Sequence, residues 1–238
     1  MKLDILAFGA HPDDIELGCG ATIAKEVSLG KQVGAIDLTR GELGTRGSAE
    51  IRKKEAATAA KILGLSVREN LHFEDGFFVN DKTHQLEIIK MIRKYQPEIV
   101  LCNAIDDRHI DHSKGSKLVS DACFLSGLLK IETELGGKLQ EHWRPTQVYH
   151  YMQWKNTKPD FLVNVSDFME VKMKAISAYA SQFYDPKSKE LETPISTKNF
   201  IDSIRYRARD LGRLIGVAYA EGYTAERYVA VEDLDKLI

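Results

Sequence analysis

Residues 3–14 read Leu-Asp-Ile-Leu-Ala-Phe-Gly-Ala-His-Pro-Asp-Asp and lead from an apolar run into a polar turn. The apolar run at 3–9 is typical of a buried strand, and helical spacing follows at 17–29. The same alternation of strand and helix recurs through the first half of the chain. It predicts a parallel sheet with helices on both faces, since alternating strands and helices form that architecture.

The remaining elements extend this pattern and then depart from it. In the first half we expect strands at 32–38, 70–73 and 98–102 and helices at 49–63, 86–95 and 114–129. In the second half we expect strands at 148–154, 161–165 and 228–231, helices at 168–180 and 199–215, and a polar loop at 182–197. Right-handed crossovers limit the topology to flavodoxin-like or half-Rossmann arrangements. We therefore predict a single domain over 1–238, an α/β Rossmann-like three-layer sandwich with a mainly parallel sheet and a C-terminal elaboration.

The composition argues against several classes of function. Lys and Arg number 33 and Asp and Glu 35, so the formal net charge of −2 gives no basic field for a nucleic acid. The cysteines are 3 in number and form no C-x-x-C pair, which fits a reducing cytosol. The first residues lack the pattern of a signal peptide, and no apolar stretch approaches the roughly 20 residues that span a bilayer. We expect a cytoplasmic protein without nucleic-acid or membrane partners.

The first polar cluster follows the first strand. His11 and Asp14 lie three residues apart where that strand ends, and ligands of open α/β sheets bind at this rim. Imidazole and carboxylate groups are both good ligands for zinc. An ordinary turn with a capping aspartate is the alternative. A cap needs only one carboxylate, however, and this turn also offers His11 and Asp13.

The second cluster follows the fourth strand, in the stretch 103–112, which contains His109, Asp111 and His112. A sheet ordered 3-2-1-4-5 makes the first and fourth strands neighbours, with connections that leave in opposite directions. Such a switch point forms a crevice at the ends of the strands. A solvated acidic loop with capping aspartates is the alternative. The joint placement of both clusters at one crevice favours a metal centre.

Together, His11-Pro12-Asp13-Asp14 and His109-x-Asp111-His112 resemble the signature of the PIG-L/LmbE-like zinc deacetylases. The resemblance covers nearly the whole chain. It includes Gly41-Glu42-Leu43-Gly44, Arg52, Glu55, Asp75-Gly76, Ser181-Gln182 and Tyr219-Ala220-Glu221-Gly222. Within that family, the runs 38–47 and 182–184 are most similar to the bacillithiol-biosynthesis deacetylases, which act on N-acetylglucosaminyl malate.

The resemblance implies a role for each matched residue. His11, Asp14 and His112 would bind one zinc ion per chain, with Fe2+ or another divalent metal as the alternative. Asp13 would be the general base, His109 would stabilise or protonate the tetrahedral intermediate, and Asp111 would tune a nearby histidine. Arg52 and Asp75 would contact the substrate. The implied reaction is attack of a zinc-activated water on the N-acetyl group of a small GlcNAc conjugate, by a homo-oligomer with a hexamer as the suggested form.

Other interpretations remain open at this point. Without the resemblance, Arg52 is better explained as a charge on an exposed helix face and Asp75-Gly76 as an ordinary turn. Two histidines and one carboxylate also describe non-haem Fe(II) oxygenases, although those occur mostly on β-rich scaffolds. A non-catalytic sugar-binding module is the third alternative. Asp13 and His109 argue against it, because binding alone requires neither an acid nor a base.

Overall fold

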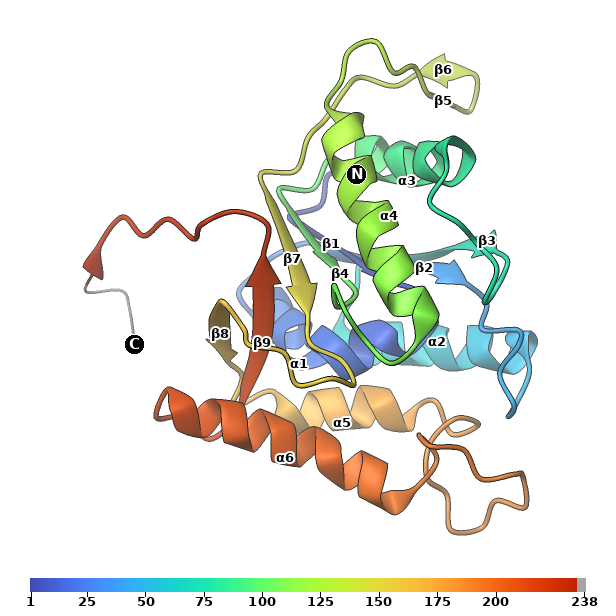
Figure 1. Ribbon diagram of the computed structural model, residues 1–238, viewed down its shortest axis with the longest axis vertical. Coiled ribbons are helices and arrows are strands. Elements are labelled where there is room, and N and C mark those ends of the chain that lie inside the picture. The colour runs from blue at the N-terminus through green and yellow to red at the C-terminus, as the bar shows by residue number, and fades with distance from the viewer. Residues whose placement is uncertain (235–238) are drawn as a thin grey trace.

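Strand β1 (Ile5–Gly9) lies inside the sheet and sends alternate side chains into two apolar layers. In the computed structural model, which describes residues 1–234, Ala7 packs into one layer and Phe8 into the other. Helices α1 (Asp14–Ser28), α2 (Ala49–Leu63) and α5 (Met169–Ser177) cover the first face. Helices α3 (Lys82–Tyr95) and α4 (Ile110–Ser126) cover the second (Figure 1). The predicted three-layer α/β sandwich is therefore confirmed.

The sheet has seven strands in the order β3-β2-β1-β4-β7-β9-β8. The strands are β2 (Val33–Thr39), β3 (Val67–Phe73), β4 (Ile99–Cys102), β7 (Gln147–Tyr151), β8 (Phe161–Asn164) and β9 (Ala220–Ala225). Pairing is parallel from β3 to β7, whereas β9 is antiparallel to both β7 and β8. The predicted order 3-2-1-4-5 is confirmed, with β7 as its fifth strand, and β1 and β4 are neighbours.

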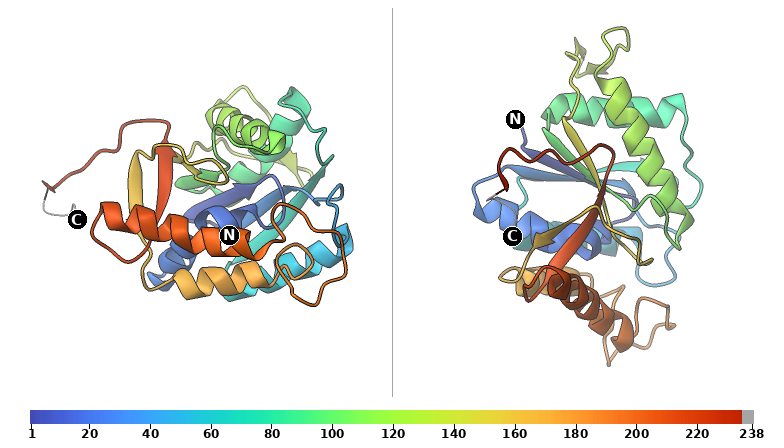
Figure 2. Two further views of the ribbon diagram at one scale, coloured as in Figure 1. Left: turned by 60° about the horizontal axis from the view of Figure 1, so that its bottom comes forward. Right: turned by 60° about the vertical axis from the view of Figure 1, so that its left-hand side comes forward.

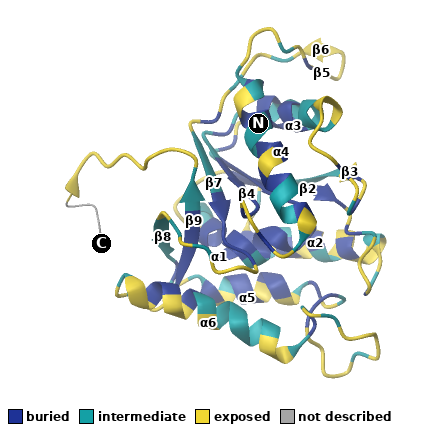
Figure 3. Cartoon of the chain, in the orientation of Figure 1, coloured by how far each residue is buried: buried dark blue, intermediate teal, exposed yellow. Residues whose placement is uncertain are grey.

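The end of the chain differs from its predicted structure. The expected strand at 228–231 is wrong, because this segment pairs with no other strand and Tyr228 is fully exposed (Figure 3). The last strand of the described part is β9, whose sequence contains Glu and Gly, two residues that are depleted in strands. A hairpin of β5 (Glu134–Leu135) and β6 (Lys138–Leu139) was also not predicted. The last four residues of the predicted domain lie outside the described residues.

Helix α6 (Lys198–Leu214) adds a further layer outside α5, as the two views of Figure 2 show. Thr197 caps its first turn by accepting a hydrogen bond from the Phe200 N–H. Ala208 and Leu211 face inward and are buried. Within residues 1–234, none of the helices has the length and apolar character required to traverse a bilayer.

The start of α1 is fixed by a close approach of helix and sheet. Tyr151 lies against Gly18, where an added Cβ would come within 2.1 Å of the Tyr151 ring. The Tyr151 hydroxyl donates to the Phe8 carbonyl at 2.8 Å. Gly18 therefore lets the first turn of α1, which carries Asp14, approach the ends of the central strands.

Candidate metal centre and substrate cavity

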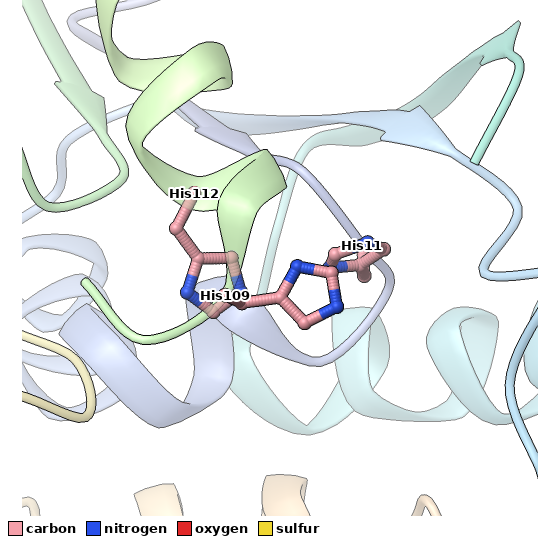
Figure 4. A group of neighbouring side chains, drawn as sticks. All are labelled: His11, His109 and His112. Atoms are coloured by element: carbon pink, nitrogen blue, oxygen red, sulfur yellow. The ribbon is translucent and has the colours of Figure 1, made fainter. Parts of the chain in front are cut away.

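Three histidines from two distant stretches of the chain meet at the ends of β1 and β4 (Figure 4). His11 follows β1, whereas His109 and His112 lie at the start of α4. The ring centroid of His11 is 4.6 Å from that of His109 and 5.6 Å from that of His112. The crevice expected between the first and fourth strands therefore brings the two clusters together.

The predicted metal ligands form a compact donor set. His11 Nδ1 lies 3.6 Å from Asp14 Oδ2, and His112 Nε2 lies 3.0 Å from Asp14 Oδ1. Zinc bonds of ~2.0–2.2 Å in tetrahedral geometry place neighbouring donor atoms about 3.4 Å apart. The Asp14 carboxylate thus lies beside one nitrogen of each imidazole, and His11, His109 and His112 offer nitrogens close enough to one another to share an ion.

The other nitrogen of each imidazole contacts a carboxylate. His112 Nδ1 lies 2.6 Å from Asp107 Oδ2. His11 Nε2 lies 3.0 Å from Asp75 Oδ1 and 3.3 Å from Asp111 Oδ2. Such contacts fix the tautomer of a metal-binding histidine and orient its ring. They leave His11 Nδ1 and His112 Nε2, the nitrogens nearest Asp14, available to a metal ion.

Asp75, which was expected to contact substrate, lines the cavity, and each of its oxygens also contacts a protein group. Oδ1 contacts His11, and Oδ2 accepts a hydrogen bond from the Leu43 N–H at 2.9 Å. Asp107 was part of the second cluster, yet sequence reasoning gave it no role. Asp107 lies five residues before His112, and that spacing does not predict a contact between their side chains.

A second group of donors lies on the opposite side of His11. His11, Asp75 and Asp111 also offer atoms close enough to share an ion. Asp111, however, is fully buried, does not line the cavity, and has the Lys114 ammonium 2.6 Å from its Oδ1. Asp111 is thus already neutralised by a lysine, and the side of His11 that faces Asp14 is the candidate centre.

Two amide side chains that sequence reasoning missed hold Asp14 in place. Asn103 Nδ2 donates to Asp14 Oδ2 at 3.0 Å, and Gln153 Nε2 donates to Asp14 Oδ1 at 2.9 Å. Gln153 Oε1 accepts from Asn103 Nδ2 at 2.9 Å, which orients both amides. Asn103 follows β4 directly and Gln153 follows β7, so the rule that places sites at strand ends could have indicated them.

The pKa values of the two adjacent aspartates, Asp13 and Asp14, are shifted in opposite directions. Burial opposes ionisation of Asp14, but the neighbouring His112 and His11 outweigh burial and hold its pKa well below the usual value. Burial raises the pKa of Asp13 to about 7, although Arg52 acts in the opposite direction. Burial alone would lower the pKa of His112, but Asp14 and Asp107 raise it to about 9.

Asp13 also has an unusual backbone. Its φ of 120° lies in a region that side-chain-bearing residues rarely adopt. Such a conformation costs of order ~1–3 kcal/mol and is most frequent at functional sites. The Asp13 side chain is buried, with Oδ2 3.4 Å from the Arg52 Nη2.

His109 is held as a neutral donor. Its Nδ1 accepts a hydrogen bond from the Asp111 N–H at 3.3 Å and so caps α4. Burial lowers the pKa of His109, and His11 and His112 lower it further. A neutral ring with an accepting Nδ1 carries its proton on Nε2.

Arg52 is buried, which excludes the alternative of a charge on an exposed helix face. Its Nη2 donates to Gln182 Oε1 as well as to Asp13. Gln182 is oriented in turn by its donation to the Arg46 carbonyl at 2.8 Å. The loop after α5 thus reaches the candidate base through Arg52.

These groups lie in a cavity of about 610 Å³, within the ~300–1,000 Å³ range of small-molecule sites. One part of its wall carries Asp13, His109 and His112. Another part comes from the second half of the chain and includes Trp154 and Arg207. The site can therefore accommodate a ligand that extends beyond the candidate metal.

Comparisons with known proteins agree with this geometry. Residues 6–123 match the profile of the family described as PIG-L: GlcNAc-PI de-N-acetylase. The diacetylchitobiose deacetylase of Thermococcus kodakarensis is 31% identical over 229 residues, which cover 92% of this chain and 81% of that protein. The expected family is therefore confirmed from sequence.

Two solved structures extend the agreement to the fold. The conserved protein TT1542 from Thermus thermophilus matches with a TM-score of 0.87 and 34% identity, over 98% of each chain. The N,N'-diacetylchitobiose deacetylase from Pyrococcus horikoshii matches with a TM-score of 0.80 and 26% identity, over 97% of this chain and 87% of that chain. The chain therefore belongs to the PIG-L, or GlcNAc-PI de-N-acetylase, family of metal-dependent deacetylases.

Proposed function

We propose that this protein is a cytoplasmic, zinc-dependent N-deacetylase that acts on N-acetylglucosaminyl malate in bacillithiol biosynthesis. The observation that carries the proposal is the convergence of His11, Asp14 and His112 beside Asp13 in one cavity. The relatives named diacetylchitobiose deacetylase support an N-acetylated amino sugar as the reacting part. The malate conjugate is supported by the resemblance of the runs 38–47 and 182–184.

The proposed ligands of a single zinc ion are His11 Nδ1, the Asp14 carboxylate and His112 Nε2. When bound, zinc acidifies a water ligand and polarises the acetyl carbonyl. A set of two nitrogens and a carboxylate also accepts Fe(II), Co(II) or Mn(II), so metal analysis of the purified protein belongs to the test.

Asp13 is the proposed general base. A pKa of about 7 suits a carboxylate that accepts a proton from water near neutral pH and passes it to the leaving amine. Arg52 contacts the same carboxylate and keeps it in place. Because Arg52 also lines the cavity, we retain it as a proposed substrate contact.

His109 is proposed to stabilise the charge that develops on the acetyl oxygen. Its Nε2–H is available as a donor because Nδ1 is already occupied by the Asp111 N–H. Donors that are fixed before the reaction stabilise an oxyanion effectively in a buried site. For the carboxylates behind His11, we propose that Asp111 and Asp75 orient that imidazole.

An acetate-release assay tests the function. The zinc-loaded protein is compared on N-acetylglucosaminyl malate, N-acetylglucosaminyl inositol and free GlcNAc, with and without a chelator. We expect the highest kcat/KM on the malate conjugate and no turnover after chelation. Sugar binding by calorimetry without acetate release over hours would instead indicate a binding module, and iron-dependent oxygen consumption would indicate an oxygenase.

Asp13→Asn is the variant that tests the base. We expect kcat to fall by ~10²–10⁴-fold with zinc retained, as for loss of a general base. Asp106→Asn is the matched control, because Asp106 is exposed and pairs at the surface with Lys155, its one ion-pair partner within residues 1–234. Full activity of the Asp13 variant with metal bound would remove Asp13 from this role.

Two further expectations belong to the same proposal. Residues 1–238 would form one domain, and that domain would assemble into a homo-oligomer, with a hexamer as the suggested form. Sedimentation velocity on the zinc-loaded protein measures the assembly directly, and a monomer at micromolar concentration would contradict it.

A further inference from the structure

We propose that Arg207 determines substrate specificity by binding a carboxylate on the group attached to the sugar. This inference rests on the proposed deacetylase function and concerns the part of the substrate that does not react. Arg207 lies on α6 and lines the same cavity as Asp13 and His112. A single substrate could therefore reach both the candidate metal and Arg207.

The contacts of Arg207 leave its charge uncompensated. Its Nε donates to Asn156 Oδ1 at 3.1 Å, and its Nη2 donates to the Trp154 carbonyl at 2.7 Å. Both acceptors are neutral, and no carboxylate within residues 1–234 forms an ion pair with it. Its Nη1 donates to no protein atom of the same residues.

The carboxylate that acts on Arg207 through space is already occupied. Burial lowers the pKa of Arg207, and Asp107 opposes this only in part. Asp107 Oδ2 contacts His112 Nδ1, and Asp107 Oδ1 accepts from the Lys155 N–H at 2.8 Å. A partly buried guanidinium without an anionic partner is unfavourable, and an anionic ligand would remove this cost.

Other arginines of α6 show the contrast. Arg205 pairs with both oxygens of Glu170 at 2.7 and 2.9 Å, and Arg213 pairs with Asp210 at 2.9 Å. Neither of them lines the cavity. Carboxylates of α5 and α6 thus neutralise these two arginines, whereas none within residues 1–234 forms an ion pair with Arg207 or with the exposed Arg209.

The surroundings of Arg207 suit a short acidic group beside a sugar. Trp154 lines the cavity, is 39% exposed, and stacks on Phe200 with ring centroids 5.6 Å apart. The Arg108 guanidinium lies 4.4 Å from the centroid of the Trp154 ring. Arg108 therefore places a second guanidinium in this part of the cavity, and the planar fork of Arg207 matches a carboxylate.

The kinetic test compares a substrate whose aglycone is anionic with one whose aglycone is a small uncharged group. Zinc-loaded wild type, Arg207→Gln and Arg207→Lys are assayed on N-acetylglucosaminyl malate and on the uncharged methyl glycoside of GlcNAc. We expect Arg207→Gln to lower kcat/KM by about 10- to 100-fold on the malate conjugate, mainly through KM, because a charge-assisted hydrogen bond is lost. Arg207→Lys should lose less, and the methyl glycoside should react at an unchanged rate with all three proteins.

Arg205→Gln is the matched control, since it removes a guanidinium from the same helix outside the cavity. It should leave both substrates unaffected. An equal loss on both substrates with Arg207→Gln would show that Arg207 supports structure and would overturn the proposal. An unchanged KM for the malate conjugate with both Arg207 variants would overturn it as well.

A binding measurement separates this inference from the proposed function. Calorimetric titration with the deacetylated product, glucosaminyl malate, requires no turnover. We expect the product to bind Arg207→Gln about 10- to 100-fold more weakly than wild type, whereas methyl glucosaminide should bind both proteins alike. Absence of acetate release by wild type would contradict the deacetylase, while equal product binding by wild type and Arg207→Gln would contradict the role of Arg207.

Discussion

Replacing Asp107 with asparagine should weaken zinc binding without disturbing the fold. Asp107 uses one oxygen for His112 Nδ1 at 2.6 Å and the other for the Lys155 N–H at 2.8 Å. Asparagine has one carbonyl oxygen and one amino group, so it can accept from only one of these two donors. Loss of a carboxylate behind a metal-binding histidine weakens the metal by ~10- to 100-fold. This corresponds to about 1.4–2.7 kcal/mol of binding free energy.

Competition with a chromophoric zinc chelator measures that change, with Asp106→Asn as the matched control. Asp106 carries the same charge one residue away, but its contact is with the Lys155 ammonium at the surface. We expect the control to bind zinc like wild type. Equal zinc affinity of Asp107→Asn and wild type would refute the role of Asp107, and equal losses in both variants would show that only net charge matters.

Three further outcomes follow from the same contacts. Because the pKa of His112 is raised to about 9 without metal and that of His11 is raised as well, zinc must displace a proton from both imidazoles, and zinc affinity should fall by more than tenfold per pH unit below 9 in chelator competition. Lys172→Met should lower the free energy of unfolding in urea by ~3–5 kcal/mol, because it leaves the Glu221 carboxylate buried without its cation. Gly18→Ala should cost ~1–3 kcal/mol in the same measurement, because its methyl group overlaps the Tyr151 ring; wild-type stability would contradict that packing.

The parallel half of the fold could be predicted because its signal is local. Every residue of β1 and of β2 is buried, so these strands appear in the sequence as largely apolar runs between helical patterns, interrupted in β2 by Asp37. Strand β9 has no such signal. Its residues are buried because β7 and β8 pair with it on either side, and that placement depends on contacts distant in sequence.

The candidate site, like the fold, could be predicted from the sequence only in part. The chain order and the strand-end rule suffice to bring His11 and His112 to one crevice. They do not reveal which carboxylate stands behind which imidazole, because that depends on side-chain directions. Arg52 is the clearest example of a residue whose position the sequence does not reveal. The helical pattern alone favoured an exposed side chain. Its burial depends on Gln182, which lies 130 residues away in sequence.

The residues proposed for the reaction and those proposed to select the substrate lie in different halves of the chain. The family profile matches 6–123, which contains every candidate metal ligand and the candidate base. Trp154, Phe200 and Arg207, which line the rest of the cavity, all lie beyond it. Interactions with a part of the substrate that does not react contribute binding energy without requiring a change at the metal. On the proposed mechanism, the second half of the chain can therefore alter which conjugate is bound, while the first half retains the proposed metal ligands and the proposed base.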